Sequence, residues 1–225
     1  MVYCVVPGVH NEDFRRMLPG TPELSERQKK TMTGNRCGKQ GCKGGIVNVR
    51  MIRKEESMRL FIAVLLTPEM KTELMRLERE FRKRGASGKL SPEENLHLTL
   101  AFIGEEGDFH RVSRALSELR FSSFEMRLSG TGSFGNLLWA GVARTPDLEA
   151  LAARVRELLK RHGIPCDEKP FLPHITLIKK ASHPDRLREP HPVSMTVSRV
   201  SLMRSDFCGN GVSYTEIARA EAGIL

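Results

Sequence analysis

Two short motifs carry the residues best suited to chemistry, His97-x-Thr99 and His174-x-Thr176. In a β-strand, residues i and i+2 lie on the same face, so each motif would present an imidazole and a hydroxyl together. The ordinary pKa of imidazole is about 6.5, so of two facing histidines one can accept a proton while the other donates one. The pair therefore predicts acid–base chemistry on a phosphoester, with Thr99 and Thr176 binding the phosphate oxygens.

The elements that position these motifs occur twice along the chain. Thr67-Pro68-Glu69 and Thr145-Pro146-Asp147 each supply a helix cap, a first-turn proline and a first-turn acid. Each cap follows an apolar strand, and each helix leads through a proline-containing turn to a strand with the His-x-Thr motif. A single motif is typical of a structural or surface histidine, but this internal repeat predicts two similar α+β lobes that share one site.

Hydrophobic periodicity and turn residues define the elements after Met58. The predicted elements are a strand at 59–66, a helix from 68 that ends at Gly85, a strand at 96–103, a helix at 109–119, strands at 124–128 and 137–142, a helix that ends at Gly163, a strand at 174–178, and strands near 193–203 and 212–220. In both motif strands the residues between histidine and threonine are aliphatic, so the opposite face should pack against helices.

Residues 1–57 differ from the rest of the chain. They hold 11 basic and 6 acidic residues, a net charge of +5 out of +9 for all 225 residues, and they lack sustained periodicity. We predict a disordered N-terminal extension at 1–57, whose charge could add RNA affinity, and a phosphoesterase domain at 58–225. The five scattered cysteines favour a cytoplasmic location, and no apolar run is long enough to cross a membrane.

A metal site is not predicted at either motif. Neither motif strand offers a Cys, Asp or Glu on its histidine face, which zinc and similar ions would need. Cys37 and Cys42 lie five residues apart, but no second pair follows at the spacing of a zinc site. We therefore expect catalysis without a metal.

The motifs and their surroundings resemble the two-histidine phosphoesterase superfamily. The likeness is closest to the RNA 2′,3′-cyclic phosphodiesterases, also called the bacterial and archaeal 2′-5′ RNA ligase family. It covers the chain from Met58 onward and none of the first 57 residues. The matching segments are 58–63, 94–104, 132–134 with 138–142, 171–177, and 204–205 with Gly211 and Tyr214.

The resemblance implies a bilobal α+β fold of two pseudo-symmetric lobes, each with an antiparallel sheet and helices on its outer face, around a central cleft. It implies hydrolysis of RNA 2′,3′-cyclic phosphate ends to 2′-phosphomonoesters, without metal or other cofactor. His97 would be the proton donor to the 3′ leaving oxygen, and His174 the proton acceptor that activates water. The implied partners are RNAs with 2′,3′-cyclic phosphate ends, tRNA fragments among them, with no membrane and no obligate protein partner.

Several further residues are weaker candidates. The family often has Arg three residues after the second threonine, where this chain has Lys179, and a regular strand would turn Lys179 away from Thr176. Phe171 is predicted either to stack on a terminal base or to pack before Pro173. Trp139, on an apolar strand, is predicted to be a core residue.

Two alternative functions stay open at this point. The same site could join RNA halves reversibly through a 2′-5′ bond, or open a small cyclic nucleotide. A function of another class is an RNA-end-binding module without catalysis. The intact histidine and threonine pairs favour an enzyme, because binding alone favours Arg and Lys.

Overall fold

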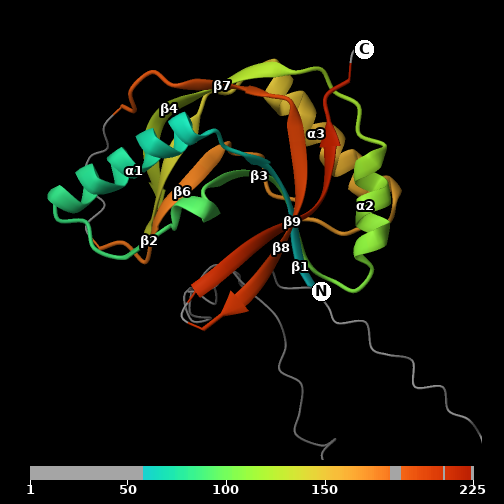
Figure 1. Cartoon of the computed structure of the whole chain (residues 1–225), viewed down its shortest axis with the longest axis horizontal. Coiled ribbons are helices and arrows are strands. Elements are labelled where there is room, and N and C mark those ends of the chain that lie inside the picture. The colour runs from blue at the N-terminus through green and yellow to red at the C-terminus, as the bar shows by residue number, and fades with distance from the viewer. Residues whose placement is uncertain (1–57, 183–188, 210, 224–225) are drawn as a thin grey trace, which may run out of the picture. The chain divides into compact units, whose positions relative to one another are not determined.

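The computed structural model describes residues 58–182, 189–209 and 211–223, and the predicted extension at 1–57 lies outside them. Figure 1 shows the elements in chain order. They are β1 (Met58–Leu65), α1 (Pro68–Lys83), β2 (Lys89–Leu90), the 3₁₀ turn η1 (Glu93–Asn95), β3 (His97–Glu106), α2 (Phe109–Ser117), β4 (Phe124–Phe134), β5 (Leu137–Val142), α3 (Pro146–Arg161), β6 (His174–Lys179), β7 (Ser194–Val197), β8 (Arg199–Cys208) and β9 (Gly211–Glu221).

The strands form two sheets, and the pairing within both is antiparallel. One has the order β3-β1-β8-β9 and the other β2-β6-β5-β4-β7. The two motif strands are divided between them, β3 in the first sheet and β6 in the second. The predicted α+β fold of two antiparallel sheets with packed helices is confirmed.

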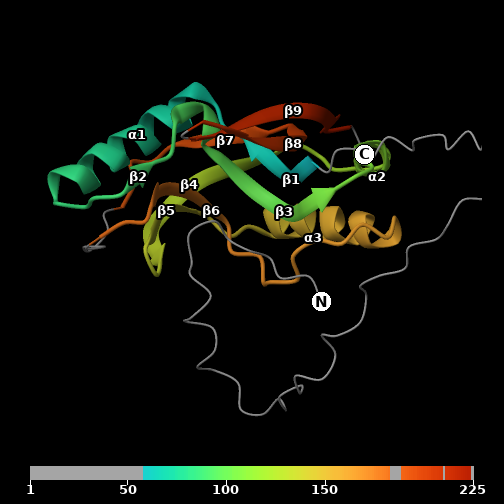
Figure 2. The same cartoon turned by 90° about the horizontal axis from the view of Figure 1, so that it is seen from below.

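Two of the helices, α1 and α3, make contacts across the two sequence repeats. The first helix, α1, follows a strand of the first sheet but contacts β6 of the second sheet, whereas α3 follows β5 and contacts both β3 and β4. The two views place α1 at one end of the described unit, and α2 with α3 at the other (Figure 1, Figure 2). The repeats therefore interlock, and one apolar core runs through both sheets.

The segment predicted as one strand near 193–203 is two strands in different sheets. β7 pairs with β4, and β8 pairs with β1. Val197 and Val200 are both fully buried. Residues three apart point to opposite faces of a continuous strand, so a break at Ser198 is what allows both valines to reach the core.

The helix caps form as the sequence predicts. The hydroxyl of Thr67 accepts from the N–H of Met70 at 3.5 Å, and that of Thr145 accepts from the N–H of Leu148 at 3.3 Å. The buried side chains of α1, which recur at helical spacing, are Met70, Glu73, Leu74, Leu77, Glu78 and Phe81. In the part of the chain that the structure describes, no helix is both long and apolar enough to span a membrane.

Candidate active site

The motif strands turn their aliphatic residues into the core and their polar residues to the other face. Leu98 of β3 and Ile175 of β6 are both fully buried. The neighbouring His97, Thr99 and His174 are half-buried. β3 and β6 contact each other although they belong to different sheets. The strand alternation predicted from the sequence is thus confirmed for both motifs.

Each histidine is oriented by the same local hydrogen bond. Nδ1 of His97 lies 2.7 Å from the carbonyl oxygen of Asn95, and Nδ1 of His174 lies 2.7 Å from that of Leu172. A carbonyl oxygen can only accept, so Nδ1 carries the proton in both rings. In the neutral ring Nε2 is then left with its lone pair, and in the protonated ring Nε2 is a donor. Proton exchange with a ligand would therefore use Nε2 in both rings.

The hydroxyl of Thr99 lies 3.1 Å from Nε2 of His97. With a neutral imidazole, the hydroxyl donates to this nitrogen. The hydroxyl of Thr99 and Nε2 of His97 are therefore close neighbours. A phosphate oxygen bound beside them could contact both groups, which is the arrangement that positions a phosphorus atom for in-line attack.

The pKa of His97 is lowered to about 4, mainly by burial and to a smaller extent by positive charge on Lys179 and His174. The hydrogen bond to the carbonyl of Asn95 acts in the opposite direction. Because the charges of Lys179 and His174 reach His97, the two motifs are close enough to interact electrostatically. In the ligand-free protein at neutral pH, His97 is the neutral imidazole.

We expect a bound anion to favour the protonated form of His97. A phosphate beside His97 supplies negative charge, which favours the protonated ring and raises its pKa. NMR titration of the imidazole should give a pKa for His97 near 4 in the free protein, rising by at least one unit when adenosine 2′-monophosphate is bound. Lys179→Gln, which removes a positive charge, should raise the pKa of His97 in the free protein. A free-protein pKa at or above 6.5 would contradict the burial of this ring.

Lys179 lies on the histidine face of β6, contrary to the expectation for a regular strand. Leu138 pairs with Ile178, but its neighbour Trp139 pairs with Thr176, so β6 holds one extra residue at this point. Leu177 and Ile178 are consequently both buried, and the next side chain returns to the side of Thr176. This bulge explains how the charge of Lys179 reaches His97.

Phe171 packs against the core, and the guanidinium of Arg156 lies 6.0 Å from its ring centre. This placement agrees with the packing alternative for Phe171. The sequence offered both readings because an aromatic residue before a proline is compatible with either.

Aromatic rings that the sequence analysis did not assign to the site surround both histidines. The rings of Phe61 and Tyr214 lie 4.8 and 5.2 Å from that of His97. The ring of Phe134, which is 42% exposed, lies edge-on to that of His174 at 5.1 Å. These rings contact each imidazole from one side. The exposed ring of Phe134 is available to contact a ligand.

Trp139 is half-buried beside the site, so its prediction as a core residue is wrong. Its ring lies 6.2 Å from that of His174 and 5.1 Å from that of Phe134. A Cβ atom at Gly132 would overlap the indole, so glycine is what lets the ring lie across β4. The pairing of Trp139 with Thr176 could have revealed this position, but cross-strand register is not visible in a sequence.

Within the described residues, no group of three or more His, Cys, Asp or Glu side chains could hold a metal ion. The site contains a different set of groups: two imidazoles, two hydroxyls, one ammonium and a frame of aromatic rings.

Comparisons with known proteins point to one group. A sequence profile described as the 2′-5′ RNA ligase superfamily matches residues 63–206. An RNA 2′,3′-cyclic phosphodiesterase of Thermotoga maritima is 31% identical over 75% of this chain and 98% of its own length. The same-named protein of Escherichia coli is 30% identical over 73% and 96%. The crystal structure of E. coli LigT complexed with 3′-AMP superposes with a TM-score of 0.68 and 29% identity, over 74% of this chain and 99% of that one.

Proposed function

Because the chain belongs to the 2′-5′ RNA ligase superfamily, we propose that it hydrolyses 2′,3′-cyclic phosphate ends of RNA to 2′-phosphomonoesters. The observation that carries the proposal is the pair of imidazoles, one from each sheet, each with Nδ1 bound to a backbone carbonyl. Nε2 is therefore the nitrogen that exchanges protons in both rings, and in His97 it lies beside the hydroxyl of Thr99. The relatives named RNA 2′,3′-cyclic phosphodiesterase support the same reaction.

In the proposed reaction, Nε2 of His174 takes a proton from water as the water oxygen attacks phosphorus. The bond from phosphorus to the 3′ oxygen breaks, and Nε2 of His97 gives that oxygen a proton. The products are a 3′-hydroxyl and a 2′-phosphate. Proton exchange with solvent then removes the proton gained by His174 and returns one to His97. His97 must be protonated to act as the acid, and the anionic substrate supplies the charge that favours this form.

Thr99 and Thr176 are proposed to bind the non-bridging oxygens of the phosphate, one from each side. Lys179 adds positive charge on the same face and acts as a point charge, without the planar fork of arginine. Such groups stabilise charge that develops on the phosphoryl oxygens during attack.

The test uses an RNA oligonucleotide with a 2′,3′-cyclic phosphate, incubated with the protein in EDTA. The expected product is the 2′-phosphate, identified by resistance to a 3′-specific phosphatase and by comparison with a standard. The matched control has a linear 3′-phosphate end and should stay unchanged. Activity that requires an added metal, a dominant 3′-phosphate product, or binding without turnover would contradict the proposal.

The same acid–base pair can run in the joining direction when a 5′-hydroxyl of RNA replaces water. Hydrolysis is the proposed main reaction because water is far more abundant than RNA ends. We also propose a cytoplasmic location and RNA ends, tRNA fragments among them, as the partner, with no obligate protein partner.

A further inference from the structure

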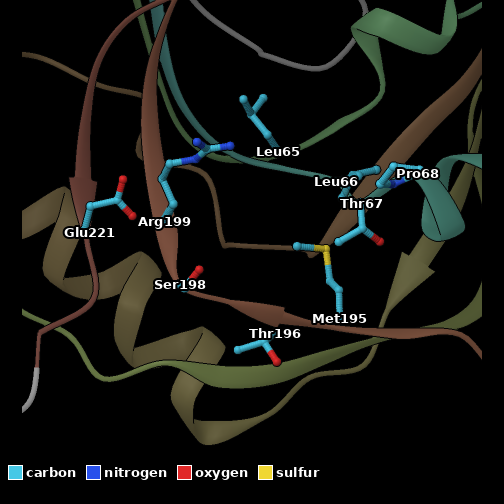
Figure 3. A pocket seen from close by; sticks show the side chains of 9 residues that line it. All are labelled: Leu65, Leu66, Thr67, Pro68, Met195, Thr196, Ser198, Arg199 and Glu221. Carbon is cyan, nitrogen blue, oxygen red and sulfur yellow. The ribbon is translucent and has the colours of Figure 1, made fainter.

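A pocket of about 440 Å³ lies where the ends of β1 and β9 meet the connection from β7 to β8 (Figure 3). The start of α1 closes one side. Its polar lining includes Arg199, Glu221 and the side chains of Thr196 and Ser198, both of which are exposed residues. None of these residues takes part in the chemistry described above.

The pocket is a close neighbour of the catalytic histidine of the first sheet. Leu65, which lines the pocket, pairs with His97 on the adjacent strand. On its other side, β1 pairs with β8 as far as Ala63 opposite Ser201, and the same register continued by two residues places Leu65 next to Arg199, which lines the same pocket. Neighbouring strands are about 4.8 Å apart, which places the backbone of Arg199 about 10 Å from that of His97.

Arg199 and His97 are also on the same face of this sheet. Val200 and Leu202 belong to the main apolar core, whereas Met203 belongs to a separate small cluster with Phe61 and Ala63, so the alternating Arg199, Ser201 and Met203 lie on the opposite face of β8. Met203 packs with Phe61, the residue whose ring contacts His97.

The lining holds one cationic and one anionic side chain, Arg199 and Glu221, which are cross-strand neighbours on β8 and β9. Among the described residues, Arg199 has no ion-pair partner, whereas the carboxylate of Glu221 is 3.1 Å from Arg219. Figure 3 shows the side chain of Arg199 reaching toward Leu65. Leu65 in turn pairs with His97 on the other side of β1. A free guanidinium with hydroxyls nearby is a typical contact for a phosphodiester.

We infer that this pocket binds the nucleotide that precedes the cyclic end, with Arg199 on the phosphodiester that joins the two. This inference rests on the proposed function, because it needs the terminal phosphate at the histidines. A separation of about 10 Å suits the next unit of an RNA chain, whereas a mononucleotide ends at the histidines and leaves the pocket empty. The enzyme should therefore prefer a chain of two or more nucleotides over a single nucleoside cyclic phosphate.

The test compares two ligands that share the same end. Binding of adenosine 2′-monophosphate and of the dinucleotide ApA with a 2′-phosphate is measured by calorimetry, and turnover is measured on the corresponding cyclic phosphates. Wild-type protein should favour the dinucleotide about tenfold in both Kd and kcat/KM. Arg199→Gln should bring this ratio close to one, and Arg199→Glu should invert it.

Arg161→Gln is the matched control, because Arg161 is an exposed arginine at the end of α3 paired with Glu118, and it should keep the wild-type ratio. Thermal unfolding and circular dichroism check that each variant folds. Equal affinity of the wild type for both ligands, or a ratio that Arg199→Gln does not change, would overturn the inference. If neither cyclic phosphate is turned over, the proposed function fails, and the binding ratio still decides whether the pocket holds the second nucleotide.

Discussion

Replacing either histidine by alanine should lower kcat/KM for a cyclic phosphate RNA by about 10³-fold. Each ring supplies one proton transfer, and a positioned acid or base contributes roughly 10² to 10⁴ in rate. His97→Ala and His174→Ala should each keep measurable binding of the 2′-phosphate product, because the threonines and Lys179 remain. Single-turnover rates and product binding measured on the same preparations separate catalysis from affinity.

The double variant should be little slower than either single variant, because the two groups act as a unit in one step. His110→Ala, which removes an exposed histidine of α2, is the matched control and should have wild-type kinetics. If His97→Ala or His174→Ala retained more than about a tenth of wild-type kcat/KM, the assignment of that histidine as an acid or base would be contradicted.

The second large effect is expected at the threonines. Thr99→Val and Thr176→Val keep the shape of the side chain but remove the hydroxyl that binds a phosphoryl oxygen. Loss of one such donor costs roughly 10²-fold to 10³-fold in kcat. Steady-state kinetics should show the loss mainly in kcat, since the contact strengthens as charge develops.

Conservative replacement checks the reason for this loss. Thr99→Ser and Thr176→Ser restore a hydroxyl and should recover most of the lost kcat. A serine variant as slow as its valine counterpart would show that the methyl group and packing matter rather than the hydroxyl, and the phosphate-binding role would be rejected.

The sequence was sufficient wherever the signal is local. The caps at Thr67 and Thr145 depend on residues within one helical turn, and the strand 137–142 was predicted with its observed bounds. Alternation within the motif strands likewise follows from adjacent residues, so the face that carries His97 and Thr99 could be predicted without a structure.

Features that depend on non-local pairing could not be predicted in this way. Whether α1 packs on its own sheet or on the other one is decided by three-dimensional packing, and both solutions bury the same apolar stripe. The bulge that returns Lys179 to the site is a property of the pairing between β5 and β6. The same holds for Trp139, whose indole reaches the site because its cross-strand neighbour is Gly132.

The pocket beside His97 is a further example. Arg199 carries no motif, and its closeness to His97 arises only because β8, from the end of the chain, pairs with β1. From the sequence alone the segment around Ser198 is a single strand, and the change of sheet that forms the pocket is hidden.

The most direct measurement of the acid–base assignment uses a cyclic phosphate in which sulfur replaces the 3′ bridging oxygen. A thiolate leaves without needing a proton, so the general acid becomes dispensable while the base is still required. We predict that His97→Ala regains a rate close to that of the wild type on the sulfur substrate and stays about 10³-fold impaired on the oxygen substrate, and that His174→Ala is impaired on both. Rescue of His174→Ala instead, or no rescue of either variant, would contradict the central claim that His97 protonates the leaving oxygen while His174 activates water.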